Sequence, residues 1–455
     1  MTPTPEAPDR LDRIHELIAA GDEGALHDFI ADFHPSDLAD LIEELDEDDR
    51  AIVFRALAPA PALAAEALAE MEWEEHPEDS LAALEPGQIA SLIAELADDD
   101  AADLIGELDP EARDRVLAAL STTDAGDIRE LLSYHEESAG GIMTTELVAI
   151  KETLSADEAI AEVRRQAREM GEFYNIFVVD SAKRLKGTLP IRTLVTAAAG
   201  EHVSDLIEPV VATVQAEMDQ EDVGRVLSRY NLVAVPVVDS VGHLLGRITF
   251  DDVIDVIEAE TTEDILKFGG VSQEEELRGR WWDAVRSRLP WLFVNLLTAC
   301  GAASVVWYFE GTIAAVPLLA VWMPVIAGMG GNTGTQALAV TVRRLAISQE
   351  TASRRWSVVG KELLVGLGNG FAIGLTVAFV AWALNQSATM GMVVMLAMWM
   401  NLAVAGFAGA FVPIVLERLH VDPAIASSIF VTTLTDLVGF FLLLGLASRL
   451  LLPGL

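Results

Sequence analysis

The residue with the clearest chemical potential is Asp436, the single ionisable residue in the apolar stretch IASSIFVTTLTDLVGFFLLLGLA. A charge at the centre of a membrane helix costs roughly 2.5–3.5 kcal/mol on insertion scales, so it needs a compensating partner. Ser428, Thr432 and Gly439 recur at helical spacing with Asp436, which predicts one small, polar helix face. Such a face can meet the hydration shell of Mg²⁺, which dehydrates reluctantly and is often held through its waters by carboxylates. The alternative is a protonated Asp436, or one bonded to a neighbouring helix.

The expected partner of this carboxylate lies in a glycine-rich segment, GMGGNTGTQ at 328–336. The amide oxygen of Asn332 can accept from ion-bound water, while the glycines permit close helix approach. Pro324 upstream and the polar run after Asn332 favour a functional break in the helix over packing alone. A glycine-mediated packing seam with an incidental asparagine is the alternative. Asn295 and Asn401 are also polar residues in apolar stretches, where either can simply bridge helices.

Carboxylates also gather at two places before the apolar region. Asp99 and Asp103 stand one helical turn apart, so they share a face and repel each other unless a divalent cation relieves the repulsion. Residues 251–270, DDVIDVIEAETTEDILKFGG, hold seven acids, and so much like charge on one connector calls for bound counterions. Asp98 and Asp100 belong to the same acidic cluster as Asp99 and Asp103, and helix caps and solvated surfaces are the alternative interpretation of both clusters.

The acidic residues end almost completely at one point in the chain. Residues 1–290 hold 65 of the 71 Asp and Glu and 23 of the 30 Lys and Arg, whereas residues 291–455 hold 6 and 7. The net charge of −41 therefore belongs to the first part, and the second is apolar enough to cross a bilayer several times. The N-terminus lacks a basic segment followed by an apolar one, so we expect the first part to stay in the cytoplasm. The single cysteine, Cys300, can form no intrachain disulfide and is interpreted as a packing residue.

Five membrane spans are expected, because each of five stretches holds about 20 or more mainly apolar residues, enough for ~30 Å of hydrocarbon. They lie near 291–309, 313–341, 362–385, 390–416 and 425–448. Basic residues crowd the segment before the first span and the loop between the second and third, which places both in the cytoplasm by the positive-inside rule. These residues are Arg286, Arg288, Arg343, Arg344, Arg354, Arg355 and Lys361. Five crossings leave the C-terminus outside.

The soluble part begins with an internal repeat. PSDLADLIEELDEDDRAIVFRAL at 35–57 recurs at 86–108 as PGQIASLIAELADDDAADLIGEL, with ten of 23 positions identical. Apolar residues at helical spacing, preceded by Pro or capped by Asp, indicate short helices stacked as in a solenoid. An acidic helical domain is therefore expected at about 10–135.

A second duplication follows, this time of alternating strands and helices. FYNIFVVDSAKRLKGTLPIRTLV at 173–195 and YNLVAVPVVDSVGHLLGRITFDDVIDV at 230–256 each place Val-Val-Asp-Ser between an apolar strand and a turn. The pair resembles tandem CBS domains, modules that commonly bind adenine nucleotides and dimerise. The second copy keeps the family's Gly-x-x-Thr-x-x-Asp pattern as Gly246, Thr249 and Asp252, whereas the first has Gly187, Pro190 and Arg192 near those places.

The whole chain resembles the MgtE-type magnesium channels and transporters. The resemblance rests on the domain order together with PVIAGMGGNTGTQALAV at 324–340 and FVTTLTDLVG at 430–439. It implies a multidomain fold: an all-α superhelical domain (10–135), an α/β CBS pair (138–200 and 201–264), a connecting or plug helix region (251–290) and an all-α five-helix transmembrane domain (291–455). It also implies a homodimer in the lipid of the cell inner membrane, with one Mg²⁺ pore in which Asp436 is the selectivity carboxylate and Asn332 stands beside it, near Ser428 and Thr432.

The same resemblance implies that cytoplasmic Mg²⁺ binds between the soluble domains and holds the pore shut. The implied sensor residues are Asp99, Asp103, Asp219, Glu221, Asp252, Asp255, Glu260, Glu263 and Asp264. Carboxylates from different domains repel until divalent ions bridge them, so ion binding closes the assembly. ATP is left open as a modulator bound at the CBS pair.

Two residues depart from the family pattern, Asn231 where an aspartate is expected and Ser428 where some relatives carry an amide. Transport of Mn²⁺, Co²⁺ or Ni²⁺ is an alternative, disfavoured because the spans hold no Cys or His ligand cluster. A nucleotide-sensing membrane regulator or enzyme is a second alternative. It is disfavoured because the sequence has neither a phosphate-binding Gly-rich loop with Lys nor a recognisable nucleophile and base, and we expect neither enzymatic activity nor a nucleic-acid partner.

Overall fold

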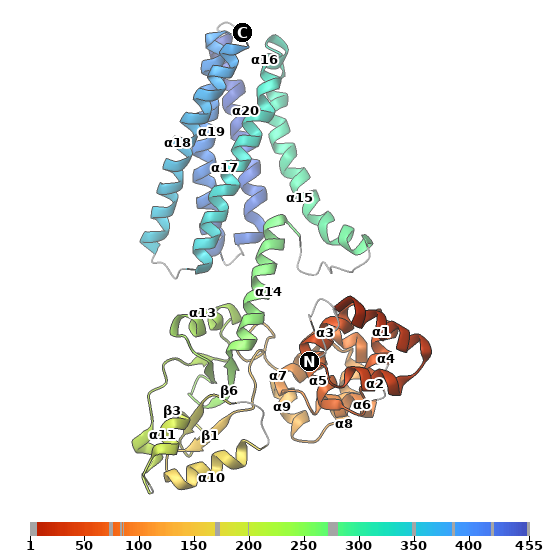
Figure 1. The fold of residues 1–455 in the computed structure, drawn as a ribbon. Coiled ribbons are helices and arrows are strands. Elements are labelled where there is room, and N and C mark those ends of the chain that lie inside the picture. The colour runs from red at the N-terminus through yellow and green to blue at the C-terminus, as the bar shows by residue number, and fades with distance from the viewer. Residues whose placement is uncertain are drawn as a thin grey trace. The chain divides into compact units, whose positions relative to one another are not determined.

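The computed structural model describes residues 7–71, 76–81, 84, 86–168, 173–198, 200–271, 281–347, 352–384, 387–419 and 423–452. The chain divides into two compact units, Met1–Glu260 and Thr261–Leu455, which are treated separately (Figure 1). The first unit contains a helical part and a part with two small sheets, and the second consists of long helices.

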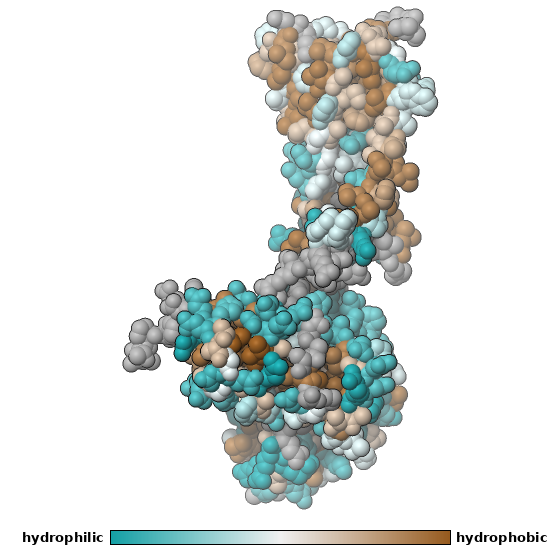
Figure 2. All heavy atoms as spheres, turned by 90° about the vertical axis from the view of Figure 1, so that its right-hand side faces the viewer, coloured by the Kyte–Doolittle hydropathy of each residue, from teal (hydrophilic) through white to brown (hydrophobic). Residues whose placement is uncertain are grey.

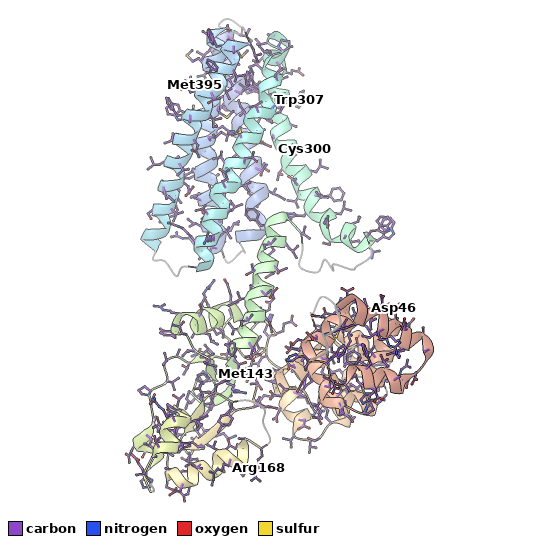
Figure 3. All side chains as sticks on the ribbon, in the orientation of Figure 1. Asp46, Met143, Arg168, Cys300, Trp307 and Met395 are labelled. Atoms are coloured by element: carbon purple, nitrogen blue, oxygen red, sulfur yellow. The ribbon has the colours of Figure 1, made fainter. Side chains whose placement is uncertain are left out.

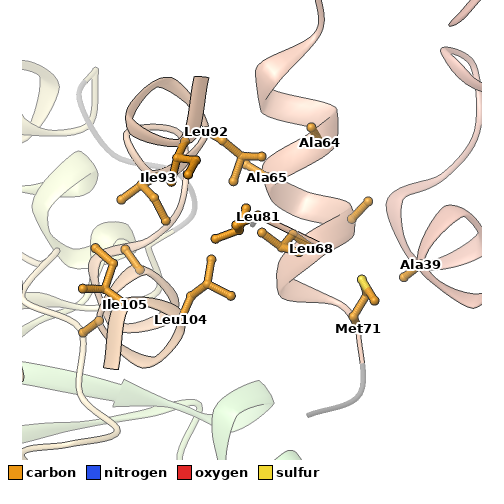
Figure 4. Close-up of a cluster of buried hydrophobic side chains, with 14 of the residues drawn as sticks. Ala39, Ala64, Ala65, Leu68, Met71, Leu81, Leu92, Ile93, Leu104 and Ile105 are labelled. Atoms are coloured by element: carbon orange, nitrogen blue, oxygen red, sulfur yellow. The ribbon is translucent and has the colours of Figure 1, made fainter. Parts of the chain in front are cut away.

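The helical part confirms the expected stack of short helices. Its elements are α1 (Ala7–Ala20), α2 (Glu23–Ile30), α3 (Pro35–Glu43), α4 (Glu47–Ala56), α5 (Pro61–Ala69), the 3₁₀ turn η2 (Pro77–Leu81), α6 (Pro86–Ile93), α7 (Asp98–Glu107), α8 (Pro110–Ala119) and α9 (Asp124–Leu131). The repeated sequences form α3 with α4 and α6 with α7. Proline begins α3, α5 and α8, where its missing N–H would have no helical partner. Figure 4 shows the buried core, with Leu81 lying between Leu68 and Leu104.

The part with two sheets repeats one topology. The first copy contains β1 (Val148–Lys151), α10 (Ala156–Gln166), β2 (Ile176–Val179), β3 (Leu185–Leu189) and α11 (Ile191–Thr196). After α12 (Val203–Leu206), the second contains β4 (Val214–Gln215), α13 (Gln220–Tyr230), β5 (Ala234–Val238), β6 (Leu244–Thr249) and the start of α14 (Phe250–Gly269). In each sheet the first strand pairs parallel and the third antiparallel with the second. The duplication predicted from sequence is therefore structural.

The repeated Val-Val-Asp-Ser motif forms the hairpin turns of the two copies. The carboxylate of Asp180 accepts from the backbone N–H groups of Ala182 and Arg184, and that of Asp239 accepts in the same way from Val241 and His243. An aspartate that bonds the backbone two residues on stabilises a turn. The two tips also pair with each other, because Leu185 N–H donates to the carbonyl of Gly242 at 3.0 Å.

The Gly-x-x-Thr-x-x-Asp pattern of the second copy has a local explanation. Thr249 precedes α14, and the carboxylate of Asp252 accepts from the backbone N–H of Thr249 at 3.0 Å and from its hydroxyl. This is half of a capping box, which satisfies a donor that the helix leaves without a partner. Gly246 is needed because a Cβ there would lie 2.6 Å from the Thr144 carbonyl and 2.8 Å from Met143 Sδ. In the first copy Pro190 precedes α11 and makes no side-chain cap.

The second unit continues with α15 (Trp281–Tyr308), α16 (Glu310–Ala315), α17 (Leu319–Ile347), α18 (Ala352–Ala383), α19 (Ala388–Arg418) and α20 (Pro423–Leu451). Four described helical segments are long and apolar enough to cross a membrane: Ala284–Tyr308, Trp356–Ala383, Ala388–Arg418 and Ile429–Leu451. At 29 residues α17 is as long, but it is not among the four, because its Gly-Asn-Thr-Gly-Thr-Gln run is less apolar. Apolar side chains cover much of the outer face of these helices (Figure 2).

Three expectations for this unit were wrong. The stretch expected to span at 313–341 divides between α16 and α17, and the glycine-rich segment 328–336 does not break the helix but lies within α17. An unbroken helix bonds its own backbone groups, which lipid cannot satisfy. Cys300 does not pack within the described chain either, because it is exposed on α15, as is Trp307 (Figure 3).

The centre of the second unit is α19, which contacts α17, α18 and α20. Glycines bring the neighbouring backbones close to it. A Cβ on Gly366 of α18 would lie 2.3 Å from the Leu402 carbonyl, and one on Gly370 would lie 2.8 Å from the Trp399 carbonyl. Small residues at such seams let membrane helices gain van der Waals contact along their length.

Candidate ion path and acidic cluster

The polar face predicted on α20 lies partly open in the single chain. Thr432 is exposed and Asp436 half-buried, while the side chain of Ser428 lies outside the described part of the structure. Asn332 of α17 is exposed as well. A Cβ on Gly331 would lie 3.9 Å from Thr432 Cγ2, which places α17 and α20 side by side at this level. The structure therefore places three predicted ion-path residues on neighbouring helices, where the described part of the chain leaves Asn332 and Thr432 exposed and Asp436 half-buried.

Asp436 also borders an open cavity of about 760 Å³ between α15, α16 and α20. Its other polar side chain is that of Glu310, the first residue of α16, and alanines such as Ala299 and Ala303 form much of the remaining wall. The sequence interpretation assigned no role to Glu310, because it lies in a short connection between two apolar stretches. Its place beside Asp436 becomes visible only when α15 and α20 are packed.

The acidic cluster of the first unit lies where α7 meets the start of α14. Burial raises the pKa of Asp100 to about 7, and the negative charges of Asp252 and Asp255 raise it in the same direction. The side chain of Asp103 is exposed at the surface, but the protein around it raises its pKa to about 7, with the charge of Asp100 as the next cause. The two predicted acidic clusters, one on α7 and one on α14, are thus close enough to repel each other. Asp100, which the sequence analysis placed in the acidic cluster but not among the sensor residues, interacts with both.

Asp99 is the most deeply buried member of this cluster, with 8% of its surface exposed. Its pKa is raised well above the usual range by burial first, and then by the charges of Asp100 and Asp252. Its Oδ1 atom has no hydrogen-bond partner among the described residues. A buried carboxylate oxygen without a donor is unfavourable as an anion, so it favours either a proton or a cation.

Asp98 fastens α7 to the segment that leads into the CBS pair. Its carboxylate accepts from the hydroxyl groups of Thr144 and Thr145 and from the backbone N–H of Thr145 at 3.1 Å. It does not cap its own helix, which begins after Ala97 without a side-chain cap. The alternative interpretation of these aspartates as N-caps of α7 is therefore wrong for Asp98.

The remaining sensor candidates already have partners within the chain. Asp219 caps α13 by accepting from Glu221 N–H at 2.9 Å, and Glu221 pairs with Arg225. Glu260 accepts from Gln220 Nε2 at 2.7 Å, which joins α14 to α13. Glu263 pairs with Lys267, and the side chain of Asp264 lies outside the described residues. Asn231 ends α13 in the left-handed conformation with φ 50°, a position where asparagine is well tolerated.

None of these carboxylates forms a ready chelate. Among the described residues, no three His, Cys, Asp or Glu side chains are grouped so as to hold a metal ion. The charges of α7 and α14 are near enough to raise one another's pKa without converging on one point. A cation at this place would have to draw the two helices' carboxylates together, or bind them through its own waters.

The fold and these groups define a class: a multi-pass membrane protein that carries an acidic helical domain and a CBS pair. Family models agree, since "Divalent cation transporter" matches residues 323–446, "MgtE intracellular N domain" matches 33–137, and "CBS domain" matches 139–200 and 203–259. The chain is 35% identical to the magnesium transporter MgtE of Thermus thermophilus over 447 residues, 96% of this chain and 98% of the relative. It is 37% identical to that of Enterococcus faecalis, covering 71% of this chain and 72% of the relative.

One solved structure extends the likeness to three dimensions. It is the cytosolic domain of the Mg²⁺ channel MgtE in complex with ATP, 34% identical, with a TM-score of 0.50 over 54% of this chain and 99% of that one. The protein belongs to the MgtE family of magnesium transporters.

The acidic cluster predicts a pH dependence in the metal-free protein. Because the pKa values of Asp100 and Asp103 rise from 3.8 to about 7 on folding, the folded state takes up protons between these limits. The resulting stabilisation is complete below pH ~4 and is lost as the pH rises through ~7, by roughly 1.4 kcal/mol per pH unit for each proton. Hydrogen exchange of α7 in the full-length protein with a chelator should therefore accelerate, beyond the intrinsic chemical effect, between pH 5.5 and 8.

Two controls sharpen this measurement. Asp100→Asn should flatten the pH dependence, because the amide neither titrates nor repels Asp252. Mg²⁺ should restore protection at pH 8 and change little at pH 5.5, where protons already neutralise the cluster. Equal protection of α7 at both pH values without metal would contradict the proposed repulsion.

Proposed function

We propose that this protein is a Mg²⁺-selective channel through which Mg²⁺ enters the cell down its electrochemical gradient. The observation that carries the proposal is the partly exposed polar face that Asn332, Thr432 and Asp436 form on two adjacent apolar helices. A carboxylate, an amide and a hydroxyl offer hard oxygen atoms, which suit Mg²⁺ better than softer divalent ions. A hydrated ion could be held through its waters, and Asp436 would supply the charge that selects a cation.

The pore requires a second wall. In the single chain Asn332 and Thr432 are exposed and Asp436 borders the open cavity beside α15, so lipid would cover the exposed part unless another chain did. A homodimer in which two such surfaces face each other would enclose one path lined by two copies of Asp436.

We place the protein in the inner membrane with its N-terminal unit in the cytoplasm and its C-terminus outside, and we retain the domain division at about 10–135, 138–200, 201–264, 251–290 and 291–455.

Gating would come from the acidic cluster. Mg²⁺ between α7 and the start of α14 would replace repulsion with attraction and hold the helical part against the second CBS copy. Because α14 leads on toward the membrane helices, this contact would keep the pore closed when internal Mg²⁺ is sufficient. Loss of the ion would release α7, and the repulsion among Asp100, Asp103 and Asp252 would favour opening.

Removing the charge at Asp436 tests the ion path. Asp436→Asn keeps the size of the side chain but loses the attraction for a cation, so Mg²⁺ influx into proteoliposomes should fall by at least about tenfold, the equivalent of ~1.4 kcal/mol. Glu417→Gln, which neutralises another acid near the end of α19, serves as the matched control and should transport normally. Undiminished influx through Asp436→Asn would remove this residue from the path.

Neutralising the acidic cluster tests the gate. The double variant Asp100→Asn with Asp103→Asn has neither the repulsion nor the anionic ligands, so its single-channel open probability should hardly depend on cytoplasmic Mg²⁺. We expect the Mg²⁺ concentration for half-closure to shift by about tenfold or more, ~1.4 kcal/mol of lost linkage. Asp114→Asn changes an exposed acid on α8 and should close like the unaltered protein. Graded closure of the double variant at unchanged Mg²⁺ concentrations would contradict the gate.

ATP binding at the CBS pair is a second candidate function. At the CBS pair, Tyr174 is 40% exposed and Phe250 is 42% exposed. Their rings pack edge to face with centroids 6.3 Å apart. An exposed aromatic side chain can stack on a nucleotide base, worth about 1–3 kcal/mol. Tyr174→Ala should therefore weaken ATP binding about tenfold by calorimetry. Equal Mg²⁺ sensitivity of the channel with and without ATP would argue against a regulatory role.

A further inference from the structure

We infer that Asn401 is a positioning residue for the ion path, which fixes the spacing of α17 and α20 from behind without touching the ion. The inference rests on the proposed function, because these two helices carry Asn332 and Asp436. It assigns a task to a polar residue in the interior of the second unit that none of the proposed ion contacts uses.

Asn401 lies on the central helix α19 and is fully buried, with 0% of its surface exposed. Its Nδ2 atom donates to the backbone carbonyl of Ile326 on α17 at 3.2 Å, whereas Oδ1 has no partner among the described residues. An unpaired buried polar atom is unfavourable, and a leucine of similar shape would avoid that cost. What the amide adds over a leucine is the hydrogen bond that ties α19 to α17.

The amide of Asn401 occupies a slot formed by one glycine from each ion-path helix. A Cβ on Gly330 of α17 would lie 2.4 Å from Asn401 Nδ2, and a Cβ on Gly439 of α20 would lie 2.8 Å from the same atom. The Gly439 position is also 2.9 Å from Ile326 Cγ2. Glycines therefore bound the amide on both sides, and a methyl group at either position would clash with it.

This slot lies directly behind the proposed ion contacts. Gly330 precedes Asn332 by two residues, so at about 100° per residue the two positions point roughly 200° apart, one toward α19 and the other outward. Buried Thr435, whose Cβ would lie 3.2 Å from a Cβ on Gly330, immediately precedes Asp436. The volume of the Asn401 side chain therefore sets how closely α17 and α20 approach at the level of Asn332 and Asp436.

An exchange of volume tests the inference in the full-length protein. Gly330→Ala adds a methyl group where the amide stands, so the yield of monodisperse protein, its thermal stability and its Mg²⁺ influx should all fall. Asn401→Ala should fold but transport Mg²⁺ about tenfold less well and discriminate less against Ca²⁺. The reason is that a small displacement of Asn332 and Asp436 from their positions strongly weakens their contact with the ion. Combining the two changes exchanges volume across the contact, and we expect the double variant to recover most of the stability lost in Gly330→Ala.

A second glycine on α17 provides the matched control. A Cβ on Gly334 would lie 2.4 Å from Val431 Cγ1 of α20, between the same two helices but away from Asn401. Gly334→Ala should be as damaging as Gly330→Ala, and Asn401→Ala should not rescue it. The inference is overturned if Asn401→Ala rescues both glycine variants or neither, or if Asn401→Ala alone keeps the influx and ion discrimination of the unaltered protein.

The same influx measurement on Asp436→Asn distinguishes failure of the proposed ion path from failure of the spacing role of Asn401. Normal influx through that variant would refute the proposed ion path, whereas selective rescue of stability would still support the spacing role of Asn401. Loss of influx in Asp436→Asn together with no selective rescue would refute the spacing role alone.

Discussion

The arrangement of the first unit depends on repulsion between clustered carboxylates. Asp99, Asp100 and Asp103 of α7 stand near Asp252 and Asp255 of α14, and the burial of Asp99 with the partial burial of Asp100 and Asp252 weakens the screening of their charges by water. The fold keeps them together by other means: Asp98 bonds Thr144 and Thr145, and Met143 fits against Gly246. Hydrogen bonds and close packing hold this contact together while the carboxylates oppose it. Binding of a cation or a proton can therefore stabilise the contact.

The second unit solves a different problem, which is how to keep polar groups at membrane depth. It buries α19 among three neighbours, with glycines at the seams, and places Asn332 and Thr432 on the outside. The interior is therefore tightly packed, while Asn332 and Thr432 remain exposed in the described part of the chain. Such a division suits a path formed between chains, because neither helix pair needs to open internally to admit an ion.

The fold could be predicted from sequence wherever a motif has a local structural task. Val-Val-Asp-Ser predicted a turn, and the aspartate bonds the turn backbone, while the family pattern Thr-x-x-Asp of the second copy proves to cap the helix that follows. The glycine-rich segment of α17 was misjudged as a break, since local sequence cannot reveal that its glycines meet Asn401 and Val431 on other helices. Likewise, Asp98 resembled a cap in sequence, and only the position of Thr144 and Thr145 shows the different partner. Sites made across elements were therefore the part that sequence could not supply.

Asp252 shows how one carboxylate can serve two neighbours at once. Its hydrogen bonds from the backbone N–H and the hydroxyl of Thr249 both end on Oδ2, so among the described residues helix capping uses a single oxygen. The charge of Asp252 raises the pKa values of the α7 acids, and its Oδ1 accepts no hydrogen bond among the described residues. A cation there would be anchored to the first turn of α14 itself, with no flexible linker between, so occupancy would act directly on the axis of the helix. The start of the helix and the ion contact would then depend on the same side chain.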